Sequence, residues 1–285
     1  MRALELFSGL GGWRCALGDQ GGILAAYDVS EAANATYALN HGDAPKAREL
    51  ATVPLAEVAD HRADTWLMSP PCQPFCRMGN HRGLEDRRSG AFLHLMEIYR
   101  QAPPERLVLE NVEGFLGSDA HALLSERIHS HGMHQLDLLA CPSRFGLPNQ
   151  RPRAFIVASR KPLKALPQPQ LQPRPIAEFL DAVEDEGLYL RASTDTRHHQ
   201  GLDLVEASDL RSACFIGGYG RRFVGSGSFL KTERGVRRFS PSEVARLLGL
   251  PEGFRFPEAL SLEAHYRLLG NSLSIPVAAW ALDHL

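Results

Sequence analysis

Short apolar runs that alternate with helical patterns over residues 2–159 limit the possible folds more than any other feature. The runs typical of strands are residues 2–6, 23–27, 65–68, 107–112 and 154–158. Helical patterns lie between several of them, most clearly at residues 90–101 and 120–131. Because strands that alternate with helices build a sheet covered on both faces, we expect an α/β fold with a doubly wound, Rossmann-like sheet.

A cysteine lies in a proline-rich run directly after the strand at residues 65–68. The run is Ser-Pro-Pro-Cys-Gln-Pro-Phe at residues 69–75, with Cys72 at its centre. Proline fixes φ and removes a backbone donor, so this run predicts a stiff loop rather than a helix. Open α/β sheets bind ligands at the carboxyl ends of their strands. Cys72 is therefore a candidate nucleophile, and the alternative is a buried structural cysteine.

Glycines follow the first expected strand, in Phe-Ser-Gly-Leu-Gly-Gly at residues 7–12. Such a turn lets the backbone approach a ligand closely. The dinucleotide fingerprint G-x-G-x-x-G is not met, because Arg14 occupies its third glycine position. This departure disfavours a dinucleotide and leaves room for an adenosyl ligand without a pyrophosphate.

An acidic residue, Asp28, ends the second expected strand. A carboxylate at this position can accept hydrogen bonds from ribose hydroxyls. The alternative is an N-cap, because a helical pattern begins near Ser30.

Three further polar motifs adjoin expected elements. Glu110 lies near the end of an apolar strand, where an unpaired carboxylate would be costly to bury. Arg151 and Arg153 precede the strand at residues 154–158, and their i, i+2 spacing directs both side chains to one face, suited to an anion. Asn271 precedes a proline-started helix. Taken singly, these residues could also be a salt-bridge partner, a solvated face and a helix cap.

Five separated motifs, in this order, resemble the cytosine-5 methyltransferase superfamily. They are Phe-Ser-Gly-Leu-Gly at residues 7–11, Pro-Pro-Cys-Gln at 70–73, Glu-Asn-Val at 110–112, Gln-Arg-Pro-Arg at 150–153 and Gly-Asn-Ser at 270–272. The chain looks most like the tRNA cytosine-5 methyltransferase branch, which is related to DNA methyltransferases. Residues 214–220 resemble that branch's Cys-Phe-Thr signature, but Ile216 stands where its threonine is expected.

The resemblance implies an S-adenosylmethionine-dependent methyltransferase fold and a covalent mechanism. Cys72 would attack C6 of cytosine. Glu110, protonated when it meets the base, would act at N3. Arg153, with Arg151 as a second candidate, would steady O2 of the base.

The resemblance also implies a set of contacts to the cofactor S-adenosylmethionine. These residues are Phe7, Leu10, Gly11, Gly12, Asp28, Val29, Leu50, Ala51, Ser69, Asn271 and Ser272. No metal is needed for this chemistry, and the cysteines and histidines show no zinc-ligand spacing.

We expect three functional segments. They are a catalytic, cofactor-binding domain at residues 1–161, a small target-recognition domain at 162–239 and a C-terminal segment at 240–285 that returns to the first domain. A proline-spaced stretch at residues 161–169 marks the first boundary.

The net charge of −2 argues against a strong general affinity for nucleic acid, but the charges are unevenly distributed. Residues 175–210 are acidic, whereas residues 211–238 hold seven basic residues against Glu233. The many glycines predict a flexible basic loop, in which Arg221, Arg222 and Tyr219 would contact RNA. The alternative is a solvated, salt-bridged surface.

Taken together, these features predict a methyltransferase acting on tRNA, in the anticodon loop. The alternatives are a DNA cytosine-5 methyltransferase of a restriction-modification system and a non-catalytic nucleic-acid-binding relative. No long apolar run and no cleavable signal occurs, so we expect a cytoplasmic protein without membrane contact. We also expect the protein to act as a monomer.

Overall fold

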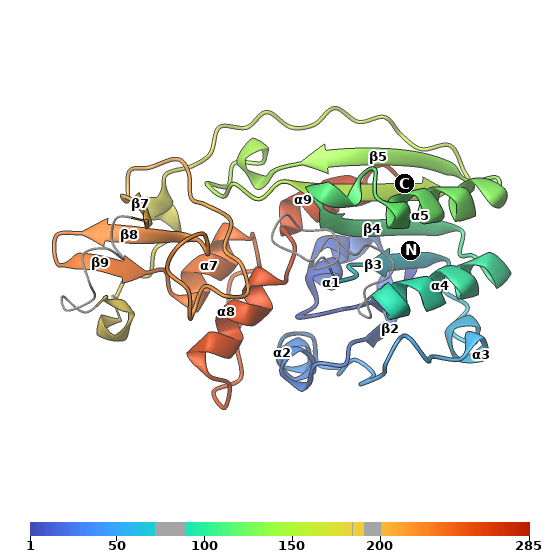
Figure 1. The fold of residues 1–285 in the computed structure, drawn as a ribbon, viewed down its shortest axis with the longest axis horizontal. Coiled ribbons are helices and arrows are strands. Elements are labelled where there is room, and N and C mark those ends of the chain that lie inside the picture. Colours follow the sequence, from blue (N-terminus) through green and yellow to red (C-terminus); the bar gives the residue numbers. More distant parts are fainter. Residues whose placement is uncertain (72–88, 184, 191–200) are drawn as a thin grey trace. The chain divides into compact units, whose positions relative to one another are not determined.

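The chain forms two compact units (Figure 1). The computed structural model describes residues 1–71, 89–183, 185–190 and 201–285. Unit 1 comprises Met1–Ala140, Pro152–Pro167 and Val277–Leu285, and unit 2 comprises Cys141–Arg151 and Gln168–Pro276.

The boundaries of the two units differ from those of the three expected functional segments. Residues 240–276 belong to unit 2, and only the last nine residues return to unit 1. There the backbone N–H of Lys164 donates to the carbonyl of His284 at 2.9 Å, and Nε1 of Trp280 donates to the carbonyl of Pro167 at 3.2 Å. The functional roles of the three segments remain a prediction.

A mixed sheet forms the centre of unit 1. Its described strands are β1 (Arg2–Leu6), β2 (Gly22–Tyr27), β3 (Thr65–Met68), β4 (Arg106–Val112), β5 (His134–Ala140) and β6 (Arg153–Ser159), in the order β2-β1-β3-β4-β6-β5. The five expected strands are confirmed, and β5 was not expected. Strands β1 to β4 are parallel, whereas β6 is antiparallel to both β4 and β5. The carboxyl ends of β1 to β4 and the amino end of β6 therefore meet at one edge.

Helices cover both faces of this sheet. They are α1 (Gly12–Leu17), α2 (Glu31–His41), α3 (Leu55–Ala59), α4 (Gly90–Gln101), α5 (Asp119–Ser130) and α9 (Ile275–Leu282), with 3-10 turns η1 (Gly18–Gln20) and η4 (Glu113–Phe115). Leu95 of α4 and Leu124 of α5 share a buried core with Leu109 of β4. On the other face, Trp13 of α1 meets the ring of Phe155 edge-on, with centroids 6.2 Å apart. Among the described helices, none is long and apolar enough to cross a membrane.

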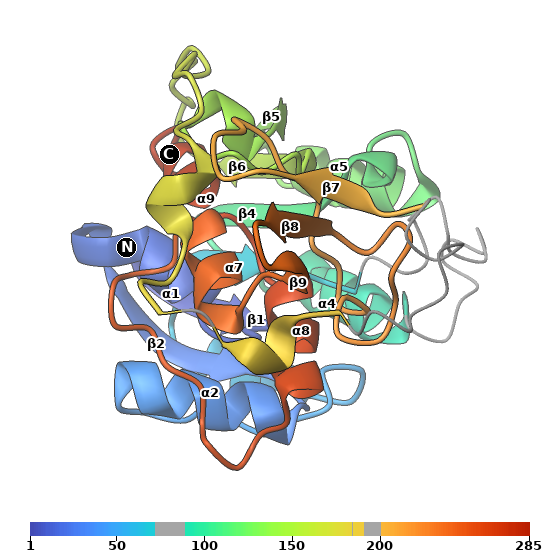
Figure 2. The ribbon, with the colours of Figure 1, turned by 90° about the vertical axis from the view of Figure 1, so that its left-hand side faces the viewer.

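The described residues of unit 2 form a small sheet, several 3-10 turns and two α-helices. Figure 2 shows how these elements are arranged. Its elements are η5 (Pro142–Arg144), η6 (Ile176–Phe179), η7 (Glu186–Leu188), β7 (Asp203–Val205), β8 (Ser228–Thr232), β9 (Gly235–Arg238), α7 (Pro241–Leu247) and α8 (Leu262–Gly270). Strands β8 and β9 form an antiparallel hairpin. The expectation of a flexible loop throughout residues 211–238 was therefore wrong for residues 228–238, which form this hairpin. The side chains of Phe229 and Leu230 are buried, and their packing stabilises β8.

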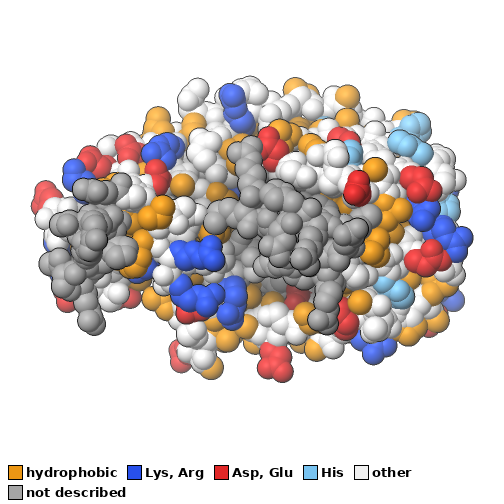
Figure 3. All heavy atoms as spheres, viewed as in Figure 1, with side chains coloured by type: hydrophobic (Ala, Val, Ile, Leu, Met, Phe, Trp, Pro, Cys, Tyr) orange, Lys and Arg blue, Asp and Glu red, His pale blue; other side chains and the backbone are white. Residues whose placement is uncertain are grey.

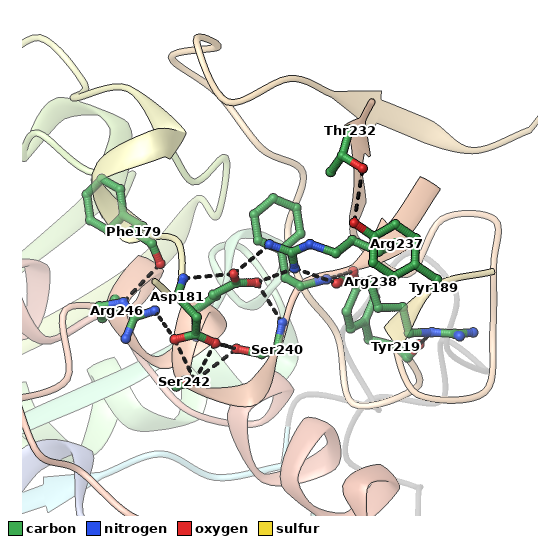
Figure 4. A network of polar contacts seen from close by, with 12 residues as sticks. Phe179, Asp181, Tyr189, Tyr219, Thr232, Arg237, Arg238, Ser240, Ser242 and Arg246 are labelled. Atoms are coloured by element: carbon green, nitrogen blue, oxygen red, sulfur yellow. Dashed lines mark hydrogen bonds and ion pairs between the residues drawn. The ribbon is translucent and has the colours of Figure 1, made fainter. Parts of the chain in front are cut away.

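A buried ion pair anchors the start of α7 in unit 2 (Figure 4). Nη1 and Nη2 of Arg237 each donate to the carboxylate of Glu243 at 2.7 Å, and these side chains are 2% and 1% exposed. Glu243 also forms a capping box with Ser240. Asp181 accepts hydrogen bonds from Ser242 and Arg246 in the same network. The bidentate geometry holds β9 and α7 in one arrangement.

Candidate active site

The carboxyl edge of the sheet in unit 1 gathers most of the predicted site residues. Phe7 follows β1, Asp28 follows β2 and Ser69 follows β3. Leu6 at the end of β1 is in register with the last residues of β2 and β3. Residues that directly follow these strands therefore lie at the same edge.

Glu110 and Arg153 pair at this edge. Nε of Arg153 lies 3.3 Å from Oε1 of Glu110, and their side chains are 15% and 10% exposed. In the antiparallel pair β4 and β6, Glu110 is opposite Phe155 and Val112 is opposite Arg153. The two side chains are thus diagonal neighbours on one face. The salt-bridge alternative for Glu110 holds in the structure, and it brings two predicted catalytic residues together.

The segment at Ser69 and Pro70, which leads to Cys72, is held against the sheet of unit 1. Nδ2 of the buried Asn111 donates to the carbonyl of Pro70 at 3.0 Å, and Nε1 of Trp13 donates to Oγ of Ser69 at 2.9 Å. Cys72 itself lies outside the described residues. The sequence analysis did not name Asn111 and Trp13 as site residues. The available signal was a polar amide next to Glu110 in an otherwise apolar strand.

The glycine turn adopts a backbone that few other residues allow. Gly11 has φ of 90°, and a Cβ on it would lie 2.3 Å from Nε2 of His41. Phe7 also has a positive φ, 59°. Only glycine fits position 11, because both the backbone angle and the space exclude a side chain.

The buried carboxyl group of Glu5 accepts hydrogen bonds from the residues that directly follow the glycine turn. Oε1 of Glu5 accepts from the backbone N–H groups of Trp13 and Arg14 at 3.1 and 3.3 Å, and Oε2 accepts from the hydroxyl of Tyr37 at 3.0 Å. Burial raises the pKa of Glu5 to about 8, although these hydrogen bonds act in the opposite direction. Sequence reasoning missed Glu5, because its place within the first strand gave no sign of this role.

Asp28 joins the glycine turn to the next helix. Its Oδ2 accepts from the N–H of Gly9 at 2.9 Å and its Oδ1 from the N–H of Ser30 at 2.8 Å. The N-cap of α2 is Ser30, whose Oγ accepts from the N–H of Ala33 at 3.3 Å. The cap alternative for Asp28 is therefore wrong, and its ribose contact remains a prediction.

The implied cofactor residues differ widely in exposure. Val29 is 60% exposed, whereas Leu10 and Leu50 are 1% and 2% exposed. Leu50 belongs to the core cluster of unit 1, and Ala51 beside it is only partly buried. The expectation that the Leu50 side chain contacts the cofactor does not fit, because that side chain packs inside the core.

Arg151 does not fit the expectation of a contact to the base. It is 2% exposed, and its guanidinium donates to the carbonyls of Phe215, Gly270 and Ser272 inside unit 2. Its donors are therefore directed at the protein backbone. Asn271 is the exposed C-cap of α8, so the cap alternative holds for it.

Tyr219 does not fit the expected stacking on RNA. It is 0% exposed, its hydroxyl donates to the carbonyl of Ser228 at 2.6 Å, and the hydroxyl accepts from the N–H of Phe239 at 3.0 Å. A ring enclosed in this way cannot stack on a base. Arg221 and Arg222 are exposed, and Nε of Arg221 lies 3.0 Å from Oε1 of Glu263.

Much of the basic segment is paired with carboxylates, as the salt-bridge alternative supposed. The described ion pairs are Arg211–Asp203, Arg221–Glu263, Lys231–Glu206, Arg234–Glu186 and Arg237–Glu243. Lys and Arg side chains still gather on the face of unit 2 near α7 and α8 (Figure 3). Arg237–Glu243 is buried, but the other four pairs are exposed and therefore weak, so they leave their cations available to a polyanion.

Comparisons with known proteins agree with this arrangement. Residues 1–198 and 190–284 match the family model of C-5 cytosine-specific DNA methylase. The chain is 30% identical to the tRNA (cytosine(38)-C(5))-methyltransferases of Schizosaccharomyces pombe and Homo sapiens, over 100% and 98% of this chain and 96% and 97% of theirs. The crystal structure of the Schizosaccharomyces pombe Dnmt2 methyltransferase superposes with a TM-score of 0.89 at 28% identity, covering 99% of this chain and 97% of that one. These matches confirm the expected α/β methyltransferase fold. The chain belongs to the C-5 cytosine-specific DNA methylase family.

Proposed function

We propose that this protein is an enzyme that transfers a methyl group from S-adenosylmethionine to C5 of a cytosine in tRNA, through a covalent bond between Cys72 and C6. The observation that carries the proposal is the Glu110–Arg153 pair, which Asn111 ties to the segment leading to Cys72. Membership of a cytosine C5 methylase family supports the same chemistry.

The residues at the sheet edge suit the steps of this reaction. A bond from Sγ of Cys72 to C6 raises the electron density at C5 and N3. Glu110 can hold a proton at N3, and Arg153 can stabilise negative charge at O2. Once C5 carries the methyl group, loss of the C5 proton and of the thiolate from C6 restores the aromatic ring.

The same edge fits S-adenosylmethionine, which supplies an electrophilic methyl group when bound. Each carboxylate oxygen of Asp28 accepts one backbone N–H, and a carboxylate offers about four acceptor sites, so ribose hydroxyls can still donate to it. The neighbouring Val29 exposes apolar surface suited to an adenine. A Cβ on Gly9 would meet no atom within 4 Å, so the backbone of the turn is open to a ligand.

tRNA is favoured as the substrate by the two relatives that are 30% identical to this chain, since their names specify tRNA. Arg221 and Arg222 are exposed cations for its backbone. We propose that the target cytosine lies in the anticodon loop. We also propose that the enzyme acts in the cytoplasm and is a monomer. The alternative substrate is duplex DNA.

The test compares methyl transfer from labelled S-adenosylmethionine to unmodified tRNA and to genomic DNA. Label should enter tRNA alone, and Cys72→Ala should abolish transfer while Cys141→Ala, a change at a half-buried cysteine of unit 2, should not. RNA carrying 5-fluorocytosine should trap a covalent adduct on Cys72, because fluorine cannot leave C5 as a proton does. Label in DNA alone would refute the substrate, and label in neither would refute the reaction.

The contact of Arg221 and Arg222 with tRNA has its own test. Changing both to Ala should weaken tRNA binding and lower its salt slope by ~0.7 for each lost phosphate contact. Lys231→Ala with Arg234→Ala is the matched control, because these cations of unit 2 are also exposed and each pairs with a carboxylate, as Arg221 does. Equal slopes for the two double variants would contradict the contact.

A further inference from the structure

A buried guanidinium joins three segments of unit 2. Nη1 of Arg151 lies 3.0 Å from the carbonyl oxygen of Phe215 and 3.3 Å from Sγ of Cys214. Its Nη2 lies 3.0 Å from the carbonyl oxygen of Gly270 and also donates to the carbonyl of Ser272. Arg151 therefore donates to the backbone carbonyls on both sides of Asn271 and to that of Phe215.

The two segments to which Arg151 donates, residues 214–217 and 270–272, also contact each other directly. A Cβ on Gly270 would lie 2.1 Å from the backbone N of Gly217 and 2.2 Å from the carbonyl carbon of Ile216. A Cβ on Gly217 would lie 3.3 Å from Oδ1 of Asn271. Backbone packs on backbone here, so a shift of the turn at residues 270–272 also shifts the segment at residues 214–217.

Only arginine has the shape that this position requires. Its planar guanidinium presents donors in a rigid fork, so two nitrogens can each serve different carbonyls. A lysine would offer one compact ammonium at a single point and would leave buried carbonyls without their donors. Buried acceptors without a donor cost free energy, so loss of the guanidinium would allow the two segments to move relative to each other.

We propose that Arg151 is a positioning residue that holds the Asn271 turn and the segment at residues 214–217 as one rigid piece. The proposal rests on the proposed function, in which Arg221 and Arg222, soon after Tyr219, contact the RNA. It also rests on the cofactor contacts that the family resemblance implies for Asn271 and Ser272. One buried side chain thereby sets the geometry of both binding surfaces without touching either ligand.

The test compares Arg151→Lys with Arg237→Lys. Both arginines are 2% exposed in unit 2, so the second variant controls for the loss of a buried guanidinium. Affinity for S-adenosylmethionine is measured by calorimetry, affinity for tRNA by fluorescence anisotropy, and Tm by thermal unfolding. Arg151→Lys should weaken both affinities about tenfold, the equivalent of one charged hydrogen bond, while Arg237→Lys lowers Tm and leaves both nearly unchanged.

Gly270→Ala supplies a second variant that keeps the guanidinium and forces the segments apart. It should weaken both affinities as Arg151→Lys does, so the proposal stays testable if the lysine variant does not fold. Affinities in Arg151→Lys or Gly270→Ala that match those of Arg237→Lys would overturn the proposal. A wild-type protein that binds neither ligand would instead refute the proposed function, so the two failures are distinguishable.

Discussion

Arg153 and Glu110 approach within 3.3 Å across neighbouring antiparallel strands, although 42 residues separate them in the chain. The register of β4 and β6 places them as diagonal neighbours at the edge where the parallel strands end. The next residue of β4, Asn111, holds the backbone at Pro70. Strand β4 therefore links the Glu110–Arg153 pair to the backbone at Pro70, which leads to Cys72, through consecutive residues.

Removing the carboxyl group of this pair should slow the chemical step. We expect Glu110→Gln to lower the rate of methyl transfer by ~10²- to 10⁴-fold, because the amide cannot exchange a proton with N3. Glu105→Gln is the matched control, since Oε1 of Glu105 also lies 3.3 Å from Nε of an arginine, Arg160, but is exposed. Single-turnover kinetics would measure both variants, and a rate for Glu110→Gln equal to that of the control would contradict the role.

Removing the amide of Asn111, which holds the backbone at Pro70, should also reduce catalysis. Asn111→Ala leaves the carbonyl of Pro70 without this donor, at a cost of ~1–3 kcal/mol. We expect the rate of methyl transfer to fall about tenfold or more, with unchanged affinity for S-adenosylmethionine. Asn40→Ala is the control, because Nδ2 of Asn40 donates to the carbonyl of Thr36 in the same unit. If the Asn111 variant keeps full activity, this anchor has no catalytic role.

The ribose contact of Asp28 can be separated from helix capping. Asp28→Ala should weaken binding of S-adenosylmethionine by ~1–3 kcal/mol through lost hydrogen bonds. Ser30→Ala removes the actual N-cap of α2, so it should cost ~1 kcal/mol of stability without lowering the affinity. Calorimetry and urea unfolding of the two variants measure these quantities. Unchanged affinity in Asp28→Ala would leave Asp28 with only its backbone contacts.

The buried carboxyl of Glu5 should make stability depend on pH. Its folded pKa is raised to about 8 by burial, so between about pH 4.3 and pH 8 the folded protein keeps a proton that the unfolded chain has released. The free energy of unfolding should therefore fall as pH rises through this window. Glu5→Gln should lack this part of the slope.

Urea unfolding at pH 5, 6, 7 and 8 would measure the slope in both proteins. Glu97→Gln is a suitable control, because Glu97 is exposed and its pKa is lowered to about 2 by hydrogen bonds from Arg100 and Gln101, outside this pH window. Parallel slopes for wild type and Glu5→Gln would show that Glu5 does not titrate in this range.

The sequence by itself determined five of the six described strands of unit 1 and the edge of the sheet at which Asp28, Glu110 and Arg153 lie. Apolar runs and a glycine turn are local signals, and the carboxyl ends of parallel strands share an edge whatever packs around them. Tertiary structure alone decided which of the candidate side chains are buried and which groups of the protein they contact. Arg151 and Arg153 have the same residue type and nearly the same place in the chain, yet the first is directed at carbonyls of unit 2 and the second at Glu110. Tyr219 lies in a glycine-rich, basic stretch, yet packing encloses its ring. Burial depends on what distant segments bring to a side chain, and no local pattern records that.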